Sequence, residues 1–193
     1  MLRNAFRFAP LLTLCLCIPI AASATETLLT DVSGQGVDPL NCSEHKAAVL
    51  VFMTTDCPVA NSFAPELKRI ADECREKNVK VTFVHVDPEL ADKDAALHAQ
   101  EYGLFGAGTV LVDRNHLLVK KTGATITPEA AVFTPAGQLA YLGRVNNQYA
   151  GYGDRRARAT EHDLRNAIEA VIAGRKVPSP RTEAIGCYIP DLD

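Results

Sequence analysis

The stretch AVLVFMTTDCPVANSFAPEL, residues 48–67, predicts a strand, a turn and the start of a helix within one short segment. AVLVFM, residues 48–53, is an unbroken apolar run of strand length, which indicates a strand buried on both faces. After Cys57 the apolar residues follow helical spacing, at Phe63, Leu67, Ile70, Ala71 and Cys74. We therefore expect Cys57 at the entry of a helix that packs one face inward.

The following segments extend this pattern into a βαβ unit. Residues 79–87, VKVTFVHVD, are rich in β-branched side chains and predict a second strand. Residues 89–103 are rich in alanine and predict a helix that stops at Gly103. A helix connects the two strands, and this arrangement predicts that they pair in parallel.

The second half of the chain changes character. Residues 109–113 predict a short strand and residues 116–123 a short helix. Residues 129–134 and 139–145 flank Pro135-Ala136-Gly137, a turn that makes them an antiparallel hairpin. A last helix, capped by Thr160 and closed by Gly174, precedes an extended tail. This order of elements predicts an α/β protein with a central mixed sheet and resembles the thioredoxin fold.

The first 24 residues predict a signal peptide. Arg3 and Arg7 precede the apolar run of residues 8–22, and Ala22-Ser23-Ala24 is a small-x-small cleavage pattern. As a membrane anchor, the run is shorter than the roughly 20 apolar residues that a bilayer requires, and two prolines interrupt it. Lipoprotein processing at Cys15 or Cys17 is disfavoured, because Leu precedes each cysteine. We expect an exported, periplasmic or secreted protein whose mature form does not span a membrane.

Cleavage leaves one domain and four cysteines. We expect a globular domain at residues 25–178 and a tail at residues 179–193. Losing Arg3 and Arg7 changes the formal charge from −3 to −5, which excludes a typical nucleic-acid surface. The remaining cysteines are Cys42, Cys57, Cys74 and Cys187. In an oxidising compartment they allow three pairings, among which the spacing does not choose.

Cys57 is the candidate nucleophile. At a helix N-terminus, unpaired backbone N–H groups and the helix dipole favour thiolate over thiol. An ordinary pKa near 8.5 leaves about 3% thiolate at pH 7, whereas a pKa near 6 gives about 90%. Asp56 opposes this activation if it faces the sulfur, or caps the helix instead. The alternative is an inert, buried cysteine in a binding or scaffold module.

Three segments resemble the thioredoxin-like redoxins, and among them the exported peroxiredoxin-like branch (alkyl hydroperoxide reductase and thiol-specific antioxidant-like proteins). They are VFMTTDCPVANSFAPEL, TITPEAAVFTPAGQLAYLGRV and EAIGCYI, between about residues 45 and 189. The resemblance implies a cis peptide bond at Thr127-Pro128, with Pro128 against the active cysteine. Ala60 replaces the second cysteine of a Cys-x-x-Cys motif.

The same resemblance gives half of a peroxidase signature. Thr54 lies three residues before Cys57, as in peroxiredoxins, but Leu50 stands where their motif has proline. Arg144 is the candidate by position for the arginine that stabilises the thiolate and the peroxide. Its alternative is a solvated arginine at a strand end. The incomplete motif favours a disulfide reductase over a peroxidase.

A lone thiolate that attacks a disulfide or peroxide needs a second thiol to resolve the product. Cys187 is our candidate, since the 13 residues from Gly174 span up to roughly 40 Å when extended. The alternative is a structural staple of the tail, worth close to 5 kcal/mol in the chain-entropy model. An external dithiol reductant or a disulfide-bearing protein is the expected partner. Cys42 and Cys74 are expected to form a structural disulfide, or Cys74 is a core residue.

A different class of function is copper binding. Thiolates and imidazole suit Cu(I), so Cys57, Cys187 and His85 form a copper site if they converge. The favoured oxidoreductase needs no cofactor or metal. Residues 146–162 form a long polar loop with three arginines, which is either a solvated connector or a site for a partner protein or an anionic substrate.

Overall fold

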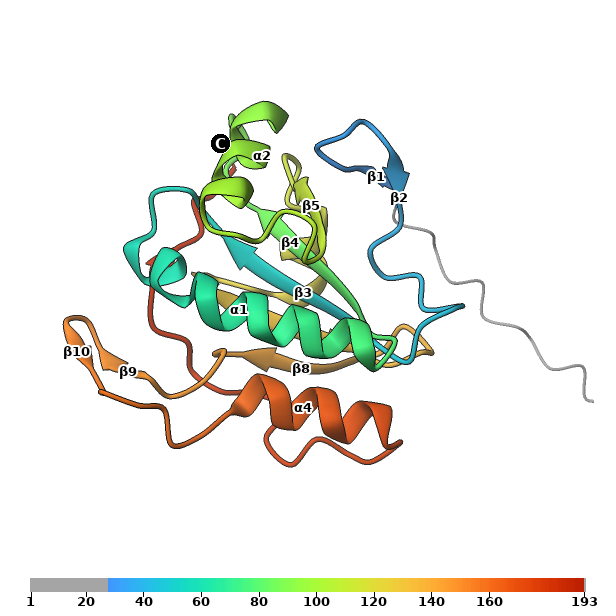
Figure 1. The fold of residues 1–193 in the computed structure, drawn as a ribbon, viewed down its shortest axis with the longest axis vertical. Coiled ribbons are helices and arrows are strands. Elements are labelled where there is room, and N and C mark those ends of the chain that lie inside the picture. The colour runs from blue at the N-terminus through green and yellow to red at the C-terminus, as the bar shows by residue number, and fades with distance from the viewer. Residues whose placement is uncertain (1–27, 193) are drawn as a thin grey trace, which may run out of the picture.

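The computed structural model describes residues 28–192, which contain a five-stranded mixed sheet (Figure 1). Helices lie on both faces of this sheet. The strand order is β5-β4-β3-β7-β8. The central strand β3 pairs in parallel with β4 and antiparallel with β7. The bounds are Ala48–Met53 for β3, Lys80–His85 for β4, Thr109–Val112 for β5, Glu129–Phe133 for β7 and Leu139–Gly143 for β8. The predicted α/β class and thioredoxin fold are confirmed.

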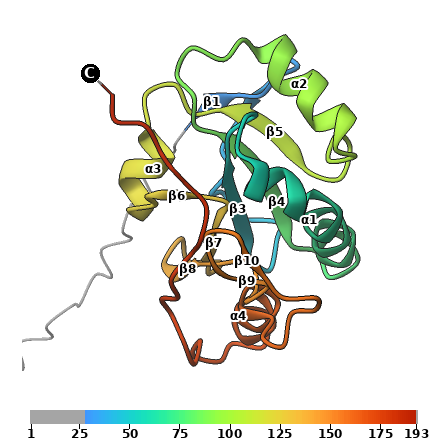
Figure 2. The same cartoon turned by 90° about the vertical axis from the view of Figure 1, so that its left-hand side faces the viewer.

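Alternation along β3 divides the core into two apolar layers, because successive side chains of a strand point to opposite faces. Val49, Val51 and Met53 pack with helices α1 and α4, whereas Leu50 and Phe52 pack with helix α3. Figure 2 shows α3 on one side of the sheet and α1 and α4 on the other. The helices are α1 (Pro58–Glu76), α2 (Asp92–Glu101), α3 (Leu117–Thr122) and α4 (Asp163–Ile172).

Short pairings cover both edges of the sheet. The hairpin of β1 (Leu29–Thr30) and β2 (Gly36–Val37) lies against β5, where the Val32 N–H donates to the Val110 carbonyl at 3.0 Å. At the other edge the tail runs beside β8, with a bridge between Leu142 and Arg181. Covered edges leave fewer unpaired backbone groups for intermolecular strand pairing.

The predictions for residues 146–163 need correction at two points. Thr160 does not cap the last helix: α4 begins at Asp163, and the Thr160 hydroxyl accepts from Asn147 Nδ2 at 2.7 Å. Residues 146–162 are not all irregular, because they contain a small hairpin of β9 (Tyr149–Gly151) and β10 (Asp154–Arg155). The glycine-rich sequence lacks the apolar alternation by which strands are recognised.

The Cys42–Cys74 disulfide prediction is also wrong. Cys42 lies in the layer with α3 and Cys74 in the layer with α1, so the sheet separates them. All four cysteines of residues 28–192 are free thiols in the structure. The predicted signal peptide lies outside the described residues. Within residues 28–192, none of the helices combines the length and the apolar character needed to cross a membrane.

Candidate active site

Cys57 occupies the N-cap position of α1 and is 1% exposed. Pro58 follows it in the first turn, where a missing N–H is tolerated. The Cys57 Sγ accepts a hydrogen bond from the backbone N–H of Ala60 at 3.4 Å. A sulfur in this place satisfies one of the helix's unpaired donors, and negative charge on it is stabilised by the helix N-terminus.

The loop before β7 supplies the second wall of the site. The Thr127–Pro128 peptide bond is cis, as the family resemblance implied. As a thiol, Cys57 donates to the Thr127 carbonyl at 3.1 Å. Thr127 belongs to the short strand β6 (Ile126–Thr127), which the sequence did not predict as a strand.

The C-terminal tail brings Cys187 to the same place. Strand β11 (Cys187–Tyr188) pairs antiparallel with β6, so that Cys187 lies opposite Thr127. The Ile189 N–H donates to the Thr125 carbonyl at 2.9 Å and extends the pairing. Figure 2 shows the tail crossing beside β6 on its way to the C-terminus. The side chains of Cys57 and Cys187, 130 positions apart in sequence, interact across this pairing, and each shifts the pKa of the other.

Gly186 permits this close approach. A Cβ at Gly186 would overlap the Thr127 carbonyl group, lying 2.7 Å from its carbon. A side chain at this position would therefore push β11 away from β6. The close pairing of the two strands thus requires glycine at position 186 for steric reasons.

The pKa values of the two thiols are shifted in opposite directions. Burial raises the pKa of Cys57, but hydrogen bonds from the Cys187 side chain, the Ala60 N–H and the Thr127 side chain outweigh it, so the pKa lies below its ordinary value. Burial raises the pKa of Cys187 to about 12, with further contributions from the Cys57 hydrogen bond and the Cys57 and Asp56 charges. The expected effect of Asp56 thus falls on Cys187. The pair favours a thiolate at Cys57 and a thiol at Cys187.

Residues 20–142 match the model of the AhpC/TSA family. The chain belongs to the AhpC/TSA family. Because the match includes β3, α1 and β7, it contains Cys57 and the cis-proline loop but ends before Cys187. No curated protein sequence matches this redoxin.

Solved structures agree on the fold of this AhpC/TSA member. An uncharacterized conserved protein from Geobacillus kaustophilus is 25% identical, with a TM-score of 0.74 over 88% of this chain and 90% of that chain. A hypothetical protein from Sinorhizobium meliloti 1021 is 23% identical, with a TM-score of 0.72 over 86% of this chain and 91% of that chain. A secreted Mycobacterium tuberculosis disulfide oxidoreductase homologous to E. coli DsbE is 19% identical, with a TM-score of 0.53 over 77% and 96% of the two chains.

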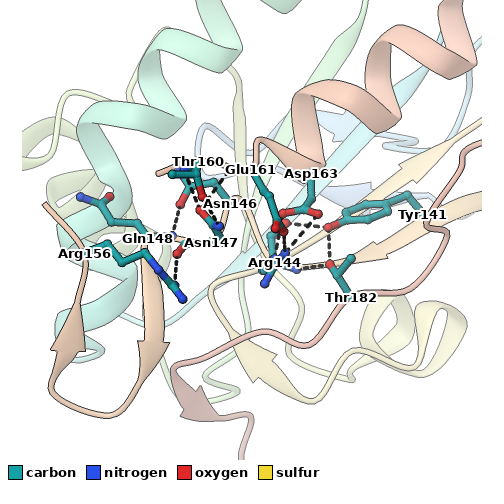
Figure 3. A network of polar contacts seen from close by, with 10 residues as sticks. All are labelled: Tyr141, Arg144, Asn146, Asn147, Gln148, Arg156, Thr160, Glu161, Asp163 and Thr182. Carbon is teal, nitrogen blue, oxygen red and sulfur yellow. Dashed lines mark hydrogen bonds and ion pairs between the residues drawn. The ribbon is translucent and has the colours of Figure 1, made fainter. Parts of the chain in front are cut away.

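Arg144 is held by carboxylates in this redoxin. Its Nε donates to Asp163 at 2.8 Å, and the guanidinium also pairs with Glu161 (Figure 3). The backbone N–H of Arg144 donates to the Thr182 hydroxyl at 3.1 Å. These contacts link the end of β8 to the start of α4 and to the base of the tail.

Thr54 lies buried at the end of β3, three residues before the nucleophile. Its hydroxyl has no hydrogen-bond partner within residues 28–192. A buried hydroxyl without a partner is rare in folded proteins. The Thr54 hydroxyl is therefore not hydrogen-bonded to Cys57 or to any other described residue.

The predicted long loop reaches the site through its hairpin. Asn147 fixes the base, because its Oδ1 accepts from the Thr160 N–H at 2.8 Å (Figure 3). Tyr149 contacts α1: its hydroxyl lies 2.8 Å from that of Ser62, and its ring packs against that of Phe63 with centroids 5.6 Å apart and planes tilted by 47°. At the tip, the Tyr152 hydroxyl donates to the Gly186 carbonyl, beside Cys187.

His85 does not join the two thiols. It is the last residue of β4, is fully buried, and packs edge-on against His98 with ring centroids 5.0 Å apart. Residues 28–192 contain no group of three or more His, Cys, Asp or Glu side chains arranged to hold a metal ion. The convergence of Cys57, Cys187 and His85 that the copper hypothesis requires is therefore not found.

Proposed function

We propose that this redoxin is an exported thiol-disulfide oxidoreductase, in which Cys57 is the nucleophile and Cys187 the resolving thiol. The observation that carries the proposal is the pairing of β11 with β6, which sets Cys187 opposite Thr127, the residue whose carbonyl accepts a hydrogen bond from the Cys57 thiol. The lowered pKa of Cys57 supports its role as the attacking group, because the thiolate is the reactive form.

The reaction consists of two thiol-disulfide exchanges. The Cys57 thiolate attacks one sulfur of a partner's disulfide, forming a mixed disulfide, and the partner's other sulfur leaves as a thiolate and takes up a proton. Cys187 then loses its proton and attacks the Cys57 sulfur. The partner's remaining sulfur leaves as a thiol, and a Cys57–Cys187 disulfide remains. Two electrons have passed to the partner, and an external dithiol restores them.

The acidities of the two thiols support this order. After burial, the contact with Cys57 is the largest cause of the raised pKa of Cys187. Once Cys57 has entered a mixed disulfide, it carries no negative charge and no longer holds the Cys187 proton. The pKa of Cys187 therefore falls at the stage at which it must attack. Cys57 reacts first because it alone has the lowered pKa.

Export is supported by the leader pattern of residues 1–24 and by the secreted mycobacterial oxidoreductase of the same fold. A disulfide substrate is favoured over a peroxide for two reasons. Leu50 replaces the proline of the peroxidase motif, and Arg144 is paired with Asp163 and Glu161. The partner is an external dithiol protein or a protein that carries a disulfide.

Disulfide mapping by mass spectrometry tests the proposal. The reduced protein is mixed with one equivalent of a small disulfide or of hydrogen peroxide, and samples are alkylated over time. We expect a Cys57–Cys187 bond to form with the disulfide, and a Cys187→Ser variant to accumulate the mixed disulfide at Cys57. A Cys42→Ala variant, changed on the opposite face of the sheet, should behave as the wild type. A Cys57 thiol that reacts with neither oxidant refutes the proposal, and faster oxidation by peroxide would assign the protein as a peroxidase.

A further inference from the structure

A partly buried chain of polar groups leads from α2 to the turn that precedes the nucleophile. His98, on α2, contacts the Asn61 Oδ1 through its Nε2 at 2.9 Å. Asn61 lies one helical turn after Cys57, and its Nδ2 donates to the Thr55 carbonyl at 2.9 Å. The Asn61 N–H also donates to the Cys57 carbonyl at 3.0 Å. Asn61 thus connects both sides of the nucleophile to α2.

The hydrogen bonds determine the chemical form of His98. The Thr55 carbonyl can only accept, so the Asn61 amide must turn its Nδ2 toward Thr55 and its Oδ1 toward His98. His98 must therefore donate from Nε2. Burial lowers the pKa of His98, and the His85 ring lies edge-on beside it. The neutral tautomer with hydrogen on Nε2 supplies the donor that the Asn61 Oδ1 requires.

We infer that His98 is a positioning residue for Cys57. Its Nε2–H fixes the amide of Asn61, and that amide fixes the carbonyl of the turn next to Cys57. The inference rests on the proposed role of Cys57 as the nucleophile. None of these residues touches the reacting sulfur through its side chain, so the effect passes through the backbone of residues 55–57.

The position of the turn matters to Cys57 because the stability of its thiolate depends on the geometry of the N-cap. The thiolate is stabilised by a single long bond from the Ala60 N–H and by contacts across the site to Thr127 and Cys187. A small shift of the turn lengthens these hydrogen bonds, which destabilises the thiolate and raises the pKa of Cys57. If Asn61 loses its acceptor contact with His98, its amide is free to rotate away from the Thr55 carbonyl.

Two substitutions of His98 separate the donor from the rest of the side chain. The Nε2 of histidine and the Nε2 of glutamine both lie three bonds from Cβ, so His98→Gln keeps a donor at the right place. In asparagine the amide nitrogen lies only two bonds from Cβ, so His98→Asn keeps polarity and loses the contact. His85→Leu is the matched control, because the His85 ring is buried beside His98 and makes no hydrogen bond within residues 28–192.

The experiment measures iodoacetamide labelling of Cys57 against pH, in a Cys187→Ser background, with the Cys57 peptide quantified by mass spectrometry. We expect His98→Asn and Asn61→Ala to raise the apparent pKa of Cys57 and to slow its labelling at neutral pH by about two- to tenfold, the effect of one hydrogen bond. His98→Gln should recover most of the rate, and His85→Leu should match the parent.

The outcomes distinguish the inference from the function on which it rests. If the parent Cys57 is unreactive, the proposed function fails. If the parent is reactive and His98→Gln is as slow as His98→Asn, or if both equal the parent while retaining native circular dichroism, the positioning role is refuted. If His98→Asn does not fold, the comparison of His98→Gln with Asn61→Ala gives the same decision.

Discussion

Replacing His85 with leucine should abolish a loss of stability in mild acid. His85 is fully buried at the end of β4, and neither ring nitrogen has a hydrogen-bond partner within residues 28–192. Burial, together with the neighbouring His98, lowers the pKa of His85 from 6.5 to about 3. The folded protein therefore holds the neutral ring, whereas the unfolded chain binds a proton near its ordinary pKa.

The direction and size of the change in the free energy of unfolding follow from the difference between the pKa of His85 in the folded and unfolded states. Between pH 6.5 and about 3 the unfolded state binds the extra proton, so the free energy of unfolding falls as the pH falls. Each pH unit below 6.5 costs about 1.4 kcal/mol, which gives a loss of about 2 kcal/mol at pH 5 from His85 alone. Above pH 6.5 the ring is neutral in both states and contributes no pH dependence.

The measurement is urea unfolding followed by circular dichroism at pH 7.5, 6, 5 and 4.5. We expect the His85→Leu variant to lose about 2 kcal/mol less than the wild type between pH 7.5 and 5. It should be at least as stable as the wild type at pH 7.5, because two unpartnered buried nitrogens are removed. His162→Leu, at an exposed position, should keep the wild-type slope. Equal slopes in the His85→Leu variant and the wild type would refute the reasoning.

Three further predictions concern the tail. Gly186→Ala should slow formation of the Cys57–Cys187 disulfide by about 100-fold, measured by disulfide mapping of quenched samples, because the displaced thiols are no longer aligned. The control is Gly151→Ala, whose Cβ meets nothing within 4 Å, and equal rates in the two variants would contradict the steric argument. Cys187→Ala should raise the Cys57 pKa, measured by labelling against pH, because it removes a hydrogen bond to the thiolate, whereas an unchanged pKa would remove Cys187 from the site. Tyr152→Phe should raise the equilibrium constant for reduction of the Cys57–Cys187 disulfide by glutathione about two- to tenfold, because the lost hydroxyl donates to the Gly186 carbonyl and holds the tail in place. An unchanged reduction potential would show that this contact does not position the tail.

The main elements of the fold are readable from local pattern. The strand predicted at 48–53 matches β3 residue for residue, and the helix predicted after Cys57 begins at Pro58. These elements are long and strongly patterned, because each buries apolar side chains with a fixed period. The missed elements, β1, β2, β6, β9, β10 and β11, are two or three residues long and depend on pairing with distant segments.

The candidate site divides in the same way. Sequence indicated Cys57 through its place at a helix start, and Cys187 through its reach. It did not indicate His98 or Asn61, because single polar residues on helices carry no pattern that marks them as hydrogen-bonded to each other. Their role depends on α2 lying beside α1, which no local spacing encodes.

Local sequence patterns were sufficient to predict the order of strands and helices, the thiol at a helix N-terminus and the absence of a second cysteine nearby. Local propensity and hydrophobic period depend only on neighbouring residues, and so these features could be predicted. The folded chain was needed to show that Cys187 lies close to Cys57, that the sheet separates Cys42 from Cys74, and that two carboxylates hold Arg144. These are contacts between residues far apart in the chain, and they are fixed by how the elements pack around one core.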